Sequence, residues 1–171
     1  MADSFRLVTP RTLIRSVAAA DLATLYAIAT RPEVARMLFV FAPDMGRAAF
    51  DAMFPPGAQM PPFRAAIERD GRVIGSIGIG AGAAPPVYYF LAPEAAGQGL
   101  ATEIVGAFAA EMVARHAPAG LTAEVFADNP ASARVLEKCG FARVEARSLS
   151  SAARPGPAPG WLFRRSGAPG L

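Results

Sequence analysis

The chain has 171 residues, a length that fits one domain, and a chain of this size buries about two-thirds of its unfolded surface. Its single cysteine excludes an internal disulfide and agrees with a reducing compartment, and one cysteine with one histidine is too small a set for a metal centre. The formal net charge of +3 comes almost wholly from arginine, and this mild excess permits an acidic partner without requiring nucleic acid.

The N-terminal third predicts one strand followed by short helices. Residues 1–4 carry no pattern, and the first residues lack the apolar run of a signal peptide, so a cytoplasmic protein is expected. A strand is expected at 12–16, an amphipathic helix at 18–30, and a second helical piece at 32–38. A short helix at 46–53 lies in a segment, 39–63, rich in methionine, phenylalanine and proline. This segment forms either an adaptable apolar pocket wall or ordinary core packing.

The central part predicts an antiparallel meander. Residues 63–68 and 72–79 flank Asp70-Gly71, which is a clear hairpin signal, and residues 87–91 should add the next strand. Residues 73–93 carry no charge, but their glycines and paired prolines would leave backbone groups unsatisfied in lipid. No membrane span is therefore expected there.

A glycine-rich turn at 94–99 joins that strand to a helix expected over about 100–116. Such a turn leaves backbone N–H groups at the positive end of the helix dipole, and its glycines allow close approach of an anion. No lysine followed by serine or threonine comes after the turn, and G-x-G-x-x-G is missing, which excludes P-loop and dinucleotide sites. The turn is either a phosphate site of another kind or a simple connector.

The C-terminal third predicts strands around one short helix. Strands are expected at 121–127, 141–147 and 161–165, a mobile Pro/Gly-rich loop at 148–160, and a frayed tail at 166–171. The helix lies within DNPASARVLEKCGF, where Asn129 is a good N-cap, Pro130 suits the first turn and Gly140 ends the helix. No repeat or linker interrupts the chain, so residues 1–171 are expected to form a single domain.

Two motifs together resemble the GNAT superfamily of acyl-CoA-dependent N-acyltransferases. Gly97-Gln98-Gly99-Leu100-Ala101-Thr102-Glu103 resembles the pyrophosphate turn of the RimJ/RimL-like branch, in which tryptophan usually stands at the place of Ala96. The pattern Asn-x-x-Ser-x-x-x-Leu-Glu-Lys-x-Gly-Phe at 129–141 resembles the second motif of the family, and residues 9–34 are similar to the start of that branch. The resemblance implies an α/β GNAT fold, with a mixed, mainly antiparallel twisted sheet flanked by helices.

The resemblance also implies a site for acetyl-CoA as co-substrate, with no metal. The pyrophosphate would bind the N–H groups of 97–102, and the pantetheine arm would follow the backbone of 91–93, in a gap between splayed strands. An oxyanion donor is expected from the backbone near Leu91. The candidate catalytic residues are Ser132, as general acid, and Asn129, which would contact pantetheine or an ordered water. The candidate cofactor-binding residues are Leu91, Ala92, Pro93, Ala96, Gly97, Gln98, Gly99, Leu100, Ala101, Thr102, Asn129 and Ser132.

Each of these side chains also has a purely structural interpretation. A serine in the first turn of a helix commonly satisfies an N–H, and Asn129 serves as an N-cap. Arg134 and Lys138 either reach the phosphates of CoA or lie on a solvated face.

The general base is open. Relatives often have a glutamate on the strand before the turn, and Pro86 occupies that place here. Glu68, Glu94 or a tyrosine acting through water are the alternatives, and an α-amine acceptor needs only a weak base because its pKa is about 7.7 to 8.0.

The sequence thus predicts an acetyl-CoA-dependent N-acetyltransferase that acts on a primary amine in a ternary complex. The acceptor is either a protein N-terminus or a small amine, with polyamines disfavoured by the basic charge balance. A catalytically silent acyl-CoA-binding regulator and a protein- or RNA-associated module are the other classes considered. The protein is expected to be a monomer or homodimer without nucleic-acid or membrane partners.

Overall fold

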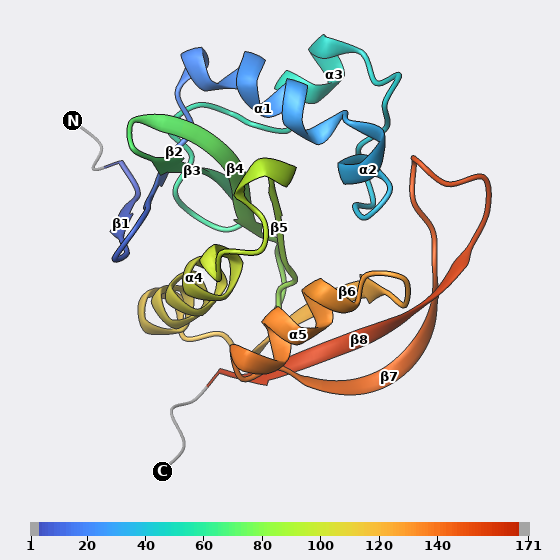
Figure 1. Ribbon diagram of the computed structural model, residues 1–171. Coiled ribbons are helices and arrows are strands. Elements are labelled where there is room, and N and C mark those ends of the chain that lie inside the picture. The colour runs from blue at the N-terminus through green and yellow to red at the C-terminus, as the bar shows by residue number, and fades with distance from the viewer. Residues whose placement is uncertain (1–3, 168–171) are drawn as a thin grey trace.

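The computed structural model describes residues 4–167, and the remainder of the tail expected at 166–171 lies outside them. Two antiparallel sheets form its frame (Figure 1). The larger sheet has the strand order β1-β2-β3-β4-β5, and the smaller has the order β6-β8-β7. The strands are β1 Arg6–Val8, β2 Leu13–Ser16, β3 Phe63–Arg69, β4 Arg72–Ile79, β5 Val87–Leu91, β6 Gly120–Phe126, β7 Ala142–Leu149 and β8 Ala158–Ser166.

Helices cover both faces of the larger sheet (Figure 1). The helices α1 Leu22–Ala29, α2 Pro32–Ala35 and α3 Arg47–Asp51 lie over one face, and a short turn of 3-10 helix, Ala19–Asp21, precedes α1. The long helix α4 Leu100–His116 covers the other face, and α5 Pro130–Lys138 packs beside it. Another 3-10 turn, Pro93–Ala95, lies between β5 and α4.

The hydrophobic core is divided in the same way. One cluster joins the apolar stripe of α4 to inward-facing residues of both sheets, with Ile104, Val105 and Phe108 fully buried. The other cluster joins α1 and the segment after α2 to the opposite face, where Phe41, Phe50 and Phe54 pack together. These three phenylalanines of the segment at 39–63 are therefore part of the hydrophobic core, as one of the two interpretations of that segment predicts.

The two sheets meet where β5 and β6 run parallel for a single bridge, between Pro86 and Thr122. The Thr122 N–H donates to the Pro85 carbonyl at 3.1 Å, and beyond this bridge no ladder joins the two strands within residues 4–167. Each strand then continues into a helix, β5 into α4 and β6 into α5. In such an arrangement the crevice beyond the carboxyl ends of the strands is a common place for a ligand.

The expected elements are present, with corrections at their ends. The helix expected at 32–38 ends at Ala35, and β1 precedes the strand expected to be first. The Pro/Gly-rich loop is shorter than predicted, because β7 extends to Leu149 and β8 begins at Ala158. The loop contacts the segment after α2, where Ala152 donates its N–H to the Phe39 carbonyl at 2.8 Å. No helix within residues 4–167 is long and apolar enough to cross a bilayer.

Candidate active site

A cavity of about 740 Å³ lies between the diverging strands β5 and β6. The starts of α4 and α5 line one part of it, and α2 with the residues that follow it lines another. Along β5, the Ala92 N–H donates to Ile74 and the Pro86 carbonyl accepts from Gly80, so these groups point to β4. Because successive peptide groups of a strand point in opposite directions, the N–H groups of Tyr89 and Leu91 point toward β6 and the cavity.

The two helix starts at the cavity differ in how they are capped. Asn129 caps α5, since its Oδ1 accepts from the Ser132 N–H at 3.3 Å. The N-cap of α4 is Gly99, with φ of +72° and no side chain to accept from the first turn. The N–H groups of Leu100, Ala101 and Thr102 therefore have no intrahelical partner and no side-chain cap. This uncapped end fits an anion such as a diphosphate.

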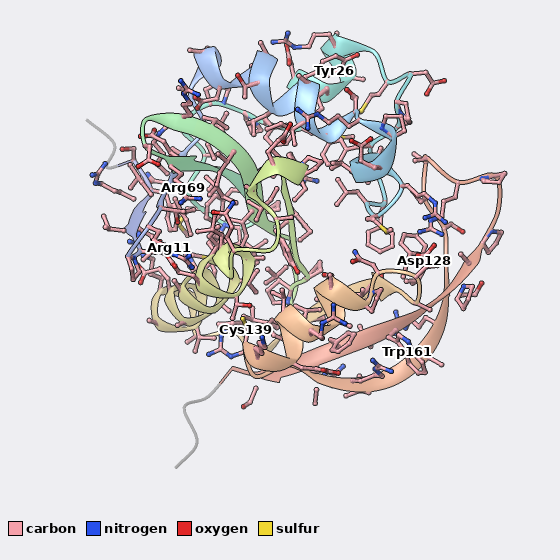
Figure 2. The ribbon with its side chains drawn as sticks, viewed as in Figure 1. Arg11, Tyr26, Arg69, Asp128, Cys139 and Trp161 are labelled. Atoms are coloured by element: carbon pink, nitrogen blue, oxygen red, sulfur yellow. The ribbon has the colours of Figure 1, made fainter. Side chains whose placement is uncertain are left out.

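Side chains from the β1–β2 turn and from the end of β3 hold the glycine turn in place. Arg11 donates from Nη1 to the Gln98 carbonyl and from Nε to Glu103 Oε2, both at 2.7 Å. Arg69 donates to Gln98 Oε1 at 2.7 Å, and Figure 2 shows both arginines on the side of the molecule where α4 begins. The Thr9 hydroxyl donates to Glu103 Oε1 at 2.7 Å. The turn is thus fixed from outside, which leaves its inner side to the cavity.

Glu103 is the anchor of this network. Burial raises the pKa of its carboxyl, but the hydrogen bonds from Thr9 and Arg11 and the Arg11 charge outweigh burial, so the pKa lies below its ordinary value. The Glu of the Gly-Gln-Gly-Leu-Ala-Thr-Glu motif is accordingly an ionised structural residue here, and its side chain points away from the cavity toward β1 and β2.

Tyr89 and Ser132 form a hydroxyl pair inside the cavity. Their oxygens are 2.7 Å apart, and either can be the donor. Burial raises the pKa of Tyr89 to about 12, and the hydrogen bond to Ser132 only partly offsets that rise. The tyrosine therefore stays protonated at neutral pH and can relay or replace a proton at Ser132.

A strap from the β7–β8 hairpin contacts the segment that follows α2. Asp128 accepts from Arg154 Nη2 at 2.8 Å and from Arg36 Nη2 at 2.7 Å, and Figure 2 labels it beneath the hairpin tip. The Arg154 guanidinium lies 3.8 Å from the ring centroid of Phe126, and Phe126 stacks on Phe39 at 5.1 Å. These contacts tie the hairpin to the segment after α2, which lines the cavity.

The carboxylates that line the cavity are Glu33 and Glu124, neither of which the sequence singled out. Glu124 lies on β6 and accepts from Arg147 at 2.8 Å through Oε1. Of the expected base candidates, Glu68 pairs with Arg15 at 2.8 Å and does not line the cavity. Glu94 is also outside the lining, with its side chain 67% exposed and paired with Arg31. Only a tyrosine among the original candidates lies within the cavity.

Most of the predicted site residues surround this one cavity. The predicted residues that do not line it are Ala92, Pro93 and Gln98. The Ala92 N–H points to β4, and the carbonyl and side-chain oxygens of Gln98 accept hydrogen bonds from Arg11 and Arg69. Arg134 and Lys138 do line the cavity. The predicted residues that line the cavity are Leu91, Ala96, Gly97, Gly99, Leu100, Ala101, Thr102, Asn129 and Ser132.

No group of three histidine, cysteine, aspartate or glutamate side chains able to hold a metal ion occurs in the part of the chain that the structure describes. Cys139 donates weakly to the Thr102 carbonyl at 3.4 Å, and burial raises the pKa of its thiol. It behaves as a packing residue between α4 and α5.

Comparisons with known proteins agree with this geometry. The fold matches an acetyltransferase of the GNAT family from Bacillus anthracis, with a TM-score of 0.80, 16% identity, and coverage of 95% of this chain and 99% of that chain. It matches Mycobacterium smegmatis RimJ, solved in complex with CoA-disulfide, with a TM-score of 0.77, 18% identity, and coverage of 95% and 86%. It also matches spermidine N-acetyltransferase from Vibrio cholerae, solved with CoA and spermine, with a TM-score of 0.75, 14% identity, and coverage of 91% and 96%.

No curated protein sequence matches the chain significantly. The family model described as "Acetyltransferase (GNAT) domain" matches residues 11–142, which include the glycine turn, all of α4 and α5, and the strands β5 and β6. With most of the chain matched, the protein belongs to the GNAT family of acetyltransferases.

Proposed function

We propose that the protein transfers an acetyl group from acetyl-CoA to a primary amine by direct attack in a ternary complex. The observation that carries this proposal is the single cavity that joins the uncapped start of α4 to a wall bearing carboxylates, through the gap between β5 and β6. One end suits a diphosphate and the other suits a cationic amine. The acceptor is a peptide N-terminus or a small amine.

Each residue of the cavity has a stated role in the proposal. The N–H groups of 100–102 hold the diphosphate, and the backbone of Tyr89 and Leu91 receives the pantetheine arm and the thioester oxygen. The amine nitrogen bonds to the acetyl carbon as the carbon–sulfur bond breaks. Glu124 accepts the proton that the amine loses, and Ser132 gives a proton to the departing thiolate and is reprotonated through Tyr89.

The test measures CoA binding by calorimetry and thiol release from acetyl-CoA over a panel of peptides and amines. We expect tight CoA binding and amine-dependent thiol release. Ser132→Ala should lower kcat on the order of a hundredfold with little change in CoA affinity, because it removes a proton donor and no binding group. Ser150→Ala, an exposed serine in the β7–β8 hairpin, is the matched control.

Two outcomes contradict the proposal. If CoA binds but no member of the panel supports thiol release, the protein is a silent acyl-CoA-binding regulator. If Ser132→Ala keeps full activity, its hydroxyl serves only in the first turn of α5.

A further inference from the structure

The side chain of Arg64, on β3, lies among three aromatic rings on the face of the sheet that α1–α3 cover. Its guanidinium carbon is 4.3 Å from the ring centroid of Tyr88, 5.3 Å from that of Phe41 and 5.4 Å from that of Phe54. Phe41 and Phe54 are buried, and Arg64 itself is largely covered. Aromatic faces hold a guanidinium by cation–π attraction and stacking, and they leave its in-plane N–H donors free.

Gly78 on β4 makes this arrangement possible. The strand register pairs Arg64 with Gly78 and Gly78 with Tyr88, so the three lie in one row across the sheet. A Cβ at Gly78 would come 2.4 Å from Cε2 of Tyr88 and 3.1 Å from Cγ of Arg64. Without that Cβ, Arg64 reaches over β4 and covers the ring of Tyr88, whose hydroxyl donates to the Ile79 carbonyl at 3.1 Å.

The charge of Arg64 has no acidic partner in residues 4–167. Within those residues no carboxylate forms an ion pair with it and no acceptor receives its N–H groups, whereas Arg11, Arg15, Arg31, Arg36, Arg147 and Arg154 are each paired. Burial lowers the pKa of Arg64, because desolvation disfavours the charged form and the electrostatic interaction with Tyr88 only partly offsets it. A guanidinium that is partly removed from water interacts more strongly with an anion at its N–H groups than a solvated guanidinium does.

The cavity of the proposed active site borders this place. Tyr88 lines the cavity, and the guanidinium of Arg64, which does not itself line it, lies against the Tyr88 ring. Glu33 and Glu124 line the same cavity, as do Arg134 and Lys138. The site therefore offers carboxylates to a cation, and beside Tyr88 the guanidinium of Arg64 is available to an anion.

We infer that Arg64 binds a carboxylate of the acceptor, so that the acceptor carries an acid group as well as the amine that is acetylated. Its class is then an amino acid or a peptide with an acidic residue next to its N-terminus. A polyamine would match only the glutamates and would leave Arg64 unpaired. This inference rests on the proposed function and specifies its substrate.

The test uses acceptor pairs that differ in one acid group. The first pair is the peptide amides Ala-Asp and Ala-Asn, and the second is β-alanine and β-alaninamide, so that the two pairs distinguish a peptide from a free amino acid. The wild-type protein should favour the acid member of at least one pair about ten- to a hundredfold in kcat/KM, as expected for hydrogen bonds to a charged group. Arg64→Met should bring that ratio close to one, chiefly by raising KM, and Arg64→Lys should give an intermediate ratio because it loses the fork.

Arg72→Met is the matched control, because Arg72 is an exposed arginine at the start of β4 and should keep the wild-type ratio. A wild-type ratio near one for both pairs, or an unchanged ratio in a folded Arg64→Met protein, overturns the inference. If Arg64→Met fails to fold, Arg64→Lys decides the matter, because Arg134 and Lys138 also line the cavity and a wild-type preference alone would not point to Arg64. An unchanged ratio in Arg64→Lys then overturns the inference.

Calorimetry of the same acceptors with the CoA-saturated protein separates this inference from the proposed function. Selective binding of acid members without any thiol release supports the inference and contradicts the proposed function. Thiol release that does not distinguish the members of either pair supports the function and contradicts the inference.

Discussion

The two ends of the cavity are built in different ways. At the start of α4 the groups that face the cavity belong to the main chain, and the side chains of Gln98 and Glu103 point outward to be held by Arg11 and Arg69. At the α2 end the groups are side chains, Glu33, Tyr88 and Glu124, from three separate elements. A backbone site suits a reagent that never changes, whereas a side-chain site can be altered one residue at a time. The first end should therefore respond to changes that move the turn, and the second to changes of single functional groups.

The largest effect is expected from Glu124→Gln at the side-chain end. Glutamine keeps the shape and can still accept from Arg147, but it cannot take a proton, so kcat should fall on the order of 10²- to 10³-fold. CoA affinity should not change. The control is Glu145→Gln, which alters the other partner of Arg147 outside the cavity. Steady-state thiol release checks the result, and equal losses in both variants would assign Glu124 a structural role only.

A smaller effect is expected at the backbone end from Glu103→Ala. Without this anchor, Thr9 and Arg11 lose their shared acceptor and the turn is free to shift, so the Kd for CoA should rise about tenfold. The acceptor KM at saturating acetyl-CoA should stay the same. Glu111→Ala on the same helix removes an exposed pair with Arg115 and serves as control. Calorimetry that finds unchanged CoA affinity in Glu103→Ala would show that the turn holds its shape without its outer contacts.

Release of the hairpin strap should act on the acceptor alone. Asp128→Asn removes the negative charge that pairs with both Arg36 and Arg154. Because these two ion pairs are partly exposed to solvent, the acceptor KM should rise only about three- to tenfold. The hydrogen bond from Arg154 and its neighbouring charge lower the pKa of Asp128, so the strap should be fully formed at neutral pH. Asp51→Asn, which breaks the exposed pair with Arg47, is the control. A change in CoA Kd larger than that in acceptor KM would argue against the division of the cavity.

The smallest effect is expected from Tyr89→Phe. Because burial raises the pKa of Tyr89 to about 12, its hydroxyl is protonated throughout pH 6 to 10. Its titration therefore does not change the rate within this pH range. The rise of kcat/KM with pH should follow deprotonation of the amine, and the variant should lower the plateau only a few-fold without moving the midpoint. Tyr26→Phe, on α1 and outside the lining of the cavity, is the control. A midpoint that shifts with Tyr89→Phe alone would mean that this tyrosine titrates during catalysis.

The sequence by itself determined the parts of the protein whose geometry is local. The turn at 94–99, its helix to His116 and the Asn129 cap could be predicted because glycine, proline and capping residues act on the backbone within a few positions. The hairpin around Asp70-Gly71 is a further case, with both glycine and aspartate at positive φ. These elements carried the family resemblance and the proposed site of the co-substrate.

Only the tertiary structure decided which side chains share the acceptor part of the cavity. Glu124 lies 36 positions from Tyr88 in the chain, and the two meet at one cavity because β5 and β6 pair at a single bridge and then diverge. Arg64 meets Tyr88 because Gly78 leaves an open place between them, and Arg154 meets Asp128 because the β7–β8 hairpin folds back toward the segment after α2. Such contacts depend on strand register and loop packing, which periodicity and turn signals do not specify.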